Sequence, residues 1–285
     1  MSLIRSKFWA LGVLFVIAPG FVRAQPAPPG ISQLLGTFTI STQFSSTSIT
    51  IRANHRYLKV IHDCTSETEE AGSYKVENGV ITLTQESLKV RDHGSKHWKD
   101  LLDPRVYRER YGEAPPSGDP PEEFVPISWG ERLYLVHQDS LVDFVNAINL
   151  AIEPRAGSCA AYFGVHLLRD GDEKKVPVGH PALPADLLSL LLDKTVDAQI
   201  ISVSHQGDEL TATIDRGSKA GLRPHMRLIG INKAPVYWQG MEVLSVQDQS
   251  AQLKLYEEAR VGDKVTSKYL PVRLEVTLPS SVAPK

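Results

Sequence analysis

The sequence predicts a mostly β protein: an antiparallel, barrel-like first domain with one inserted helix, then a small C-terminal β-barrel. Apolar residues alternate with polar ones through residues 36–85 and again through 196–256, which is the period of half-buried strands. Turn signals such as Asn78-Gly79, the preferred pair of a two-residue hairpin, separate these runs. Strands joined by such short turns should pair antiparallel.

The chain begins with the pattern of a secretory signal peptide. Arg5 and Lys7 precede the apolar run 8–18, and small residues allow cleavage after Ala24. The alternative is a membrane anchor, but the run is shorter than the roughly 20 residues that span a bilayer. We therefore expect residues 1–24 to be removed, the mature chain to have no membrane span, and the protein to be periplasmic or secreted.

Composition narrows the function classes further. Of 285 residues, 42% are apolar, which supports ordinary hydrophobic cores. The formal net charge is -2, and losing Arg5, Lys7 and Arg23 would bring it to about -5, that is, -2 minus three positive charges. No stripe of Lys and Arg with interleaved aromatics is present, so we expect no nucleic-acid binding.

Breaks in the strand pattern predict the domain organisation. Prolines and charged residues interrupt the first domain, and a short apolar helix leads into the second. The expected order is a signal peptide at 1–24, a linker at 25–31, a β domain at 32–184 with a loop insertion at 86–123, a connecting helix at 185–194, a small β-barrel at 195–268 and a tail at 269–285.

One helix is expected inside the first domain. Ser140 can cap it, and apolar residues follow at helical spacing as far as Ile152, before Pro154. Asp143 and Asn146 lie near one face of this helix. Paired with Arg132 of the preceding turn, they could line a cleft; the alternative is a solvated helix face.

The second domain carries a motif that resembles a known module. The motif runs from Ile214-Asp215-Arg216-Gly217 through Ala220-Gly221-Leu222-Arg223-Pro224, with Gly262-Asp263-Lys264-Val265 near the end. It resembles the small β-barrel of bacterial envelope proteins such as the C-terminal domain of flagellar assembly protein T, which implies a barrel fold. That pattern has a glycine where His225 stands, so the turn there is expected to differ.

Two other resemblances bear on the fold. Residues 217–224 followed by 228–232 look like a PDZ signature, but a PDZ domain would then need a helix, and residues 241–256 have strand patterning instead. The first domain is weakly similar to lipocalin-like or lysozyme-inhibitor-like meanders, through His62-Asp63-Cys64 and the strands that follow. The meander resemblance specifies no ligand, whereas a PDZ domain would bind a peptide.

Few residues stand out as site candidates. Cys64 and Cys159 are the two cysteines, and in an oxidising compartment they suggest a disulfide; the alternative is two free thiols. His93 and His97, or His62 with Cys64, could share a metal, but a solvated loop and a bridged Cys64 are the simpler interpretations. The candidate binding residues are Trp129, Arg132, Asp143, Asn146, Tyr237 and Trp238. We expect no catalytic residue, metal or cofactor.

Three functions remain open. The first is a non-enzymatic envelope protein that serves as a binding or assembly module, with other envelope proteins as its partners. The second is an exported enzyme or enzyme inhibitor that uses the 86–123 insertion, because long loops on rigid scaffolds often carry function. The third is a carrier of a small ligand, which needs an open barrel interior. PDZ-like peptide binding by the second domain is a further alternative.

Overall fold

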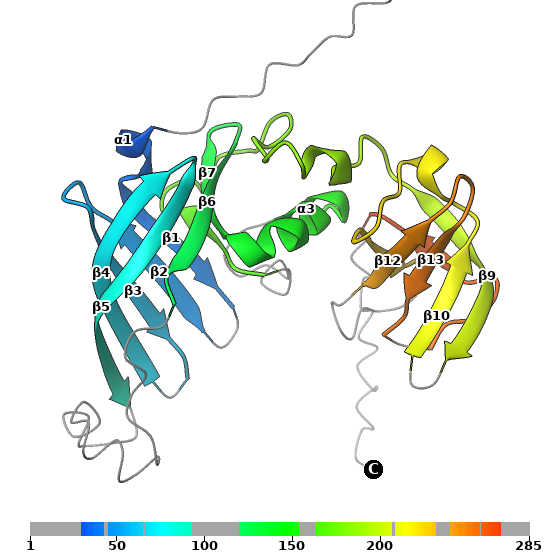
Figure 1. Ribbon diagram of the computed structural model, residues 1–285, viewed down its shortest axis with the longest axis horizontal. Helices are drawn as coiled ribbons and strands as arrows, with labels where there is room; N and C mark the ends of the chain where they lie inside the picture. Colours follow the sequence, from blue (N-terminus) through cyan, green and yellow to red (C-terminus); the bar gives the residue numbers. More distant parts are fainter. Residues whose placement is uncertain are drawn as a thin grey trace, which may run out of the picture.

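The computed structural model describes residues 30–42, 45–64, 66–92, 120–153, 164–206, 209–231, 240–256 and 258–268. Two closed antiparallel barrels confirm the predicted fold class, one of eight strands and one of six. A single α-helix of more than one turn, α3 (Leu141–Asn149), lies between the two barrels among these described residues (Figure 1).

The first barrel is an up-and-down meander in which each strand pairs with the next. The short helix α1 (Ile31–Leu34) lies at one end of it (Figure 1), where Leu34 is completely buried. Strand β8 pairs with both β7 and β1, which closes the sheet. The strands are β1 (Gly36–Ser41), β2 (Ser46–Ile51), β3 (Arg56–His62), β4 (Ser66–Glu77), β5 (Val80–Asp92), β6 (Glu122–Trp129), β7 (Arg132–His137) and β8 (His166–Arg169).

The predicted hairpin turn at Asn78-Gly79 is confirmed, and a second tight turn joins β6 to β7. Asn78 and Gly79 join β4 to β5 with φ values of 52° and 80°, as a type I′ turn requires. Gly130 takes a φ of 60° in the turn between β6 and β7. Strand β5 runs to Asp92, so the predicted insertion begins seven residues later than its expected start at 86.

Side chains fill the interior of the first barrel. A buried apolar cluster takes up much of it, with Phe38, Ile49, Tyr57 and Phe124 among its members. Beyond Tyr57 the same face of β3 carries Lys59, which is 8% exposed and pairs with both Glu70 and Glu122. The Tyr57 hydroxyl donates to Glu70, so the buried cation and its carboxylates satisfy one another.

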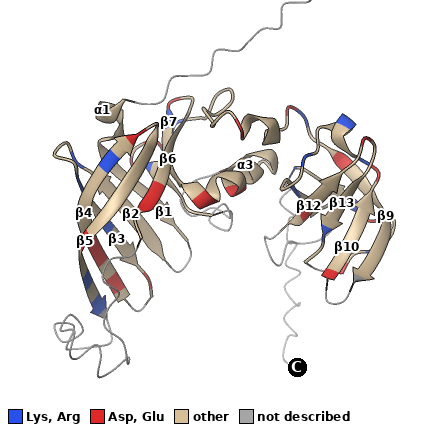
Figure 2. Ribbon diagram, viewed as in Figure 1, with Lys and Arg blue, Asp and Glu red and all other residues tan. Residues whose placement is uncertain are grey.

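Charges on the outside of this barrel are paired across the long β4–β5 hairpin. The Glu69 carboxylate lies 3.0 Å from Lys89 Nζ, and the Glu67 carboxylate lies 3.1 Å from Arg91 Nη1. Figure 2 shows acidic and basic residues close together along these strands. Exposed pairs of this kind add little stability, so this face is best described as a solvated surface.

The second barrel is smaller, and a single apolar cluster makes up most of its core. Its strands follow the order β10, β13, β12, β11, β14, β9, and all pair antiparallel. The core includes Ile214, Leu228, Val243, Leu253 and Val265, each completely buried. The strands are β9 (Asp197–Gln206), β10 (Glu209–Ile214), β11 (Arg227–Gly230), β12 (Met241–Val246), β13 (Ala251–Lys254) and β14 (Lys264–Thr266).

The second barrel differs from the sequence expectation at two places. His225, where the resembling pattern has glycine, takes a positive φ of 69°, the left-handed region that glycine favours. In the segment predicted as a connecting helix at 185–194, the structure has only the 3-10 turn η4 (Leu188–Leu190). Asn149 accepts from the Leu192 amide and donates to the Leu190 carbonyl, so the connector of turns and bends is held against α3.

Helix α3 joins the two barrels. Its apolar side, with Phe144 and Val145, packs on the outside of β6, β7 and β8. Its other side meets the second barrel through Asn146, whose amide donates to the His225 carbonyl and accepts from the Arg227 amide, each at 2.9 Å. Asn146 is only 2% exposed, so the expectation of a solvated helix face is wrong at this residue.

Replacing Asn146 with alanine should loosen this contact. Two buried hydrogen bonds would be lost and two backbone groups left unsatisfied, which costs about 1–3 kcal/mol. Amide hydrogen exchange should therefore become faster at Arg227. Asn149→Ala, on the same helix, should instead affect Leu192. Unchanged exchange at Arg227 in the Asn146 variant would contradict the contact.

Candidate functional site

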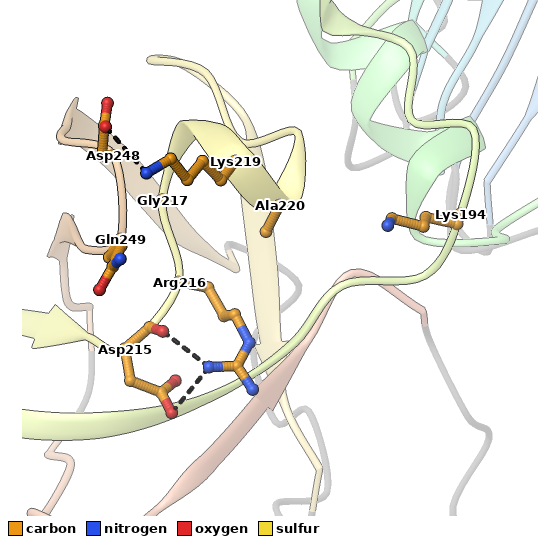
Figure 3. A pocket seen from close by; sticks show the side chains of 8 residues that line it. All are labelled: Lys194, Asp215, Arg216, Gly217, Lys219, Ala220, Asp248 and Gln249. Carbon is orange, nitrogen blue, oxygen red and sulfur yellow. Dashed lines mark hydrogen bonds and ion pairs between the residues drawn. The ribbon is translucent and has the colours of Figure 1, made fainter.

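An open cleft on the second barrel is a candidate site in the described part of the chain. It has a volume of about 350 Å³ and lies among the strand-end loop 215–220, the turn at 248–249 and Lys194 of the connector. Figure 3 shows these side chains around the cleft, with Lys194 on the opposite side from the loop. The residues that line it are Lys194, Asp215, Arg216, Gly217, Lys219, Ala220, Asp248 and Gln249.

Gly217 sets the shape of this cleft. A Cβ at this position would lie 2.1 Å from the Gln247 carbonyl oxygen and 2.6 Å from the Ser250 amide. The loop therefore approaches the β12–β13 turn more closely than any other residue allows, and the Ser218 amide donates to Gln247 at 2.8 Å. The 3-10 turn η5 (Ser218–Ala220) follows and ends at Gly221, whose φ is +97°.

Replacing Gly217 with alanine should destabilise the second barrel. The added methyl group must displace backbone rather than a flexible side chain, and overpacking of this kind costs about 1–3 kcal/mol. Urea unfolding measures the loss. Gly30→Ala is a matched control, since a Cβ there meets open space. Equal stabilities of the two variants would contradict the close approach.

The carboxylates of the cleft are already engaged by groups of this chain. Asp215 accepts from the Gln199 amide at 2.8 Å and pairs with Arg216 at 3.1 Å. Asp248 pairs with Lys219, also at 3.1 Å. Lys194 makes no hydrogen bond or ion pair with any described residue. The cleft therefore has three cationic side chains against two carboxylates.

Trp129 and Arg132, two of the predicted binding residues, hold a surface segment in place. Arg132 is 3% exposed; it pairs with Glu153 at 2.6 Å and donates to the carbonyl oxygens of Glu173 and Lys175. The Trp129 indole donates to the Gly179 carbonyl at 2.8 Å. Their polar groups thus fix residues 173–179 onto the first barrel, and we call this segment the strap.

Asp172 anchors the start of the strap. Burial acts to raise the pKa of this carboxyl, but the Lys175 ammonium, the Leu133 amide and Arg169 outweigh that effect, so the pKa lies below its usual value. Asp172 is therefore held as the carboxylate. At the far end the strap exposes Val176 and Val178, at 73% and 71%.

Asp143 and Asn146, two more predicted binding residues, lie where the barrels meet. Asp143 pairs with Arg227 at 2.9 Å, beside a small cleft of about 300 Å³ that also includes His225 and Glu242. The sequence pattern placed both residues on one helix face but did not show that the second barrel covers that face. Arg132 is not part of this group.

The remaining predicted residues fall mostly outside the described part of the chain. Tyr237, Trp238, Cys159, His93 and His97 all lie outside it, and Cys64 is exposed next to β3. The Cys64–Cys159 disulfide therefore stays a prediction. His62 lies 3.3 Å from Glu67. No group of three or more His, Cys, Asp or Glu side chains in the described residues is placed to hold a metal.

Sequence reasoning missed His166, on the outside of β8 beneath α3. It is 2% exposed, its ring packs at 5.7 Å from Phe144, and neither ring nitrogen has a hydrogen-bond partner in the described structure. Burial lowers the pKa of this imidazole to about 4, and the nearby Gly164 backbone opposes that shift only in part. His166 is therefore neutral at pH 7 and belongs to the packing under α3.

Comparison with known proteins gives no relative for this chain. No family model, curated protein or solved structure matches it. Among the described residues, no helix has both the length and the hydropathy needed to cross a membrane.

Proposed function

We propose that this protein is an exported, non-enzymatic envelope protein that acts as a binding or assembly module. The observation that carries the proposal is the arrangement of two filled barrels fixed to one helix. Such an arrangement places the available polar groups on the outer surface rather than in an internal chamber.

The filled interiors argue against a carrier of small ligands. A carrier needs space inside the barrel, whereas apolar side chains and the paired Lys59 occupy much of the first barrel and apolar side chains occupy the second.

The rigid link between the barrels favours an assembly role. Asn146 and Asp143 contact Arg227 of β11, and Asn149 contacts the connector, which restricts the relative movement of the two barrels. Two barrels that already have a restricted orientation lose less conformational freedom when a partner binds both of them. The entropic cost of binding is therefore lower.

The proposal is tested by capture of partners from an envelope extract. The bait is the chain from residue 25 onward with an affinity tag, and the control is the same tagged chain unfolded by heat before use. Mass spectrometry of both eluates should find at least one protein specific to the folded bait. Native mass spectrometry of the purified chain runs in parallel.

Each outcome separates the competing functions. A specific protein partner supports the binding or assembly role. Absence of any partner, together with a small molecule retained by the folded chain, would favour the carrier or the enzyme. Capture of only proteins that share a free C-terminal sequence would favour PDZ-like peptide binding by the second barrel.

A further inference from the structure

We infer that the cleft on the second barrel binds an acidic segment of a partner protein through Lys194, Arg216 and Lys219. The inference rests on the proposed binding role and names the site and the partner chemistry. The three cations come from two segments that are distant in the sequence, the connector and the motif loop, and the fold brings them to one surface (Figure 3).

Hydrogen-bond capacity in the cleft favours an anionic guest. The two carboxylates are occupied by this chain, whereas the cations have donors to spare. Arg216 uses Nη1 for both its contacts, with the Asp215 carbonyl oxygen and carboxylate, and its other nitrogens have no partner among the described residues. The Lys194 ammonium offers three donors and uses none there. Such surplus donors match carboxylate oxygens.

Arg216 is also held in position for such contacts. Its Nη1 contacts the carbonyl oxygen and the carboxylate of Asp215, which limits the positions of the guanidinium, and Asp215 is itself held by the Gln199 amide of β9. A guanidinium group whose position is already restricted loses less rotational freedom on binding a carboxylate than a freely rotating side chain does. The cleft is open and about 350 Å³ in volume, so an extended peptide can lie across it.

The test measures binding of a fluorescein-labelled, end-capped hexaglutamate peptide to the chain from residue 25 onward, by anisotropy at about 50 mM salt, where screening is weak. Lys194→Gln should weaken binding at least about fivefold. Arg216→Lys keeps the positive charge but loses the planar guanidinium group, and it should weaken peptide binding less than Lys194→Gln does. Lys264→Gln, on the exposed side of β14, is the matched control and should leave binding unchanged.

A variant that should bind the peptide more tightly provides a second test. Asp248 is 75% exposed in its side chain and pairs with Lys219, so Asp248→Asn frees that ammonium without altering the core. Binding should tighten about two- to fivefold. Inorganic phosphate should compete only weakly, because it meets the cations at one point rather than along the cleft.

Several results would overturn the inference. These are no binding by the wild-type chain, an equal loss in Lys264→Gln, or full displacement by phosphate at the concentration of the peptide. If the captured envelope partner binds Lys194→Gln as well as wild type, the assembly role stands and this site is wrong. If no partner is captured at all, the assembly role itself fails, whatever the peptide does.

Discussion

Replacing Arg132 with alanine is expected to lower the free energy of unfolding by about 1–3 kcal/mol or more, because the change leaves several buried polar groups without their partner. Glu153, the Tyr134 hydroxyl and two carbonyl oxygens of the strap would lose their partner together. The Glu153 side chain is 36% exposed and can recover water, so most of the cost falls on the buried groups. Equilibrium urea unfolding measures the change.

Two companion measurements identify the cause. Arg132→Lys keeps the charge but cannot reach all four acceptors, and should lie between wild type and alanine. Trypsin should cut at Lys174 or Lys175 faster in the alanine variant, since the strap loses its anchor. A loss of stability below about 1 kcal/mol, with unchanged cleavage, would show that Asp172 and Trp129 hold the strap without Arg132.

Acidification is expected to destabilise the protein by up to about 3 kcal/mol between pH 6.5 and 4, through His166 alone. The pKa of this imidazole is about 4 in the folded chain, below its ordinary value of 6.5. Between pH 6.5 and 4, His166 is protonated in the unfolded chain but neutral in the folded chain. The free energy of unfolding therefore decreases as the pH falls. Below pH 4 both states are protonated and this contribution ends.

His166→Leu is the variant that isolates this effect. Leucine fills the apolar site beneath Phe144 without a titrating group, so its stability curve should be flatter than that of wild type from pH 6.5 to 4. Carboxylates such as Asp172, whose pKa is lowered, contribute stability that is lost only at more acidic pH. Parallel curves for wild type and variant through this range would contradict the burial of a neutral imidazole.

Strand alternation and turn chemistry predicted the antiparallel strands, because they depend on neighbouring residues. They did not predict that β8 closes the first barrel onto β1, because that pairing joins segments about 130 residues apart. Asn78-Gly79 fixes its hairpin locally, and that turn has the expected geometry. The helix 141–149 was also predicted, since its apolar repeat is local. Its role in joining the barrels was not, because Asn146 finds its partners about 80 residues further along the chain.

Only part of the candidate site could be predicted from the sequence. The loop 215–221 was recognised as a fold motif, and its glycine does serve close packing. Lys194 lay in a segment expected to be a helix, and nothing local connects it with Arg216. Arg132 stood out as a surface candidate but is buried, because its acceptors come from the strap some 40 residues later.

The strand that closes the first barrel also governs the order in which the chain can fold. Strand β1 needs β8, and Thr39 and Asp170, which share a hydrogen bond of 2.8 Å across that seam, are 131 residues apart in sequence. A chain that emerges N-terminus first must keep β1 unpaired on one side until residue 169 has appeared, and closing so long a loop is entropically slow. During that interval β1 and β7 present open edges that can pair with other chains. Helix α3 appears before the seam closes, so the surface that receives the second barrel is available before the first barrel is complete.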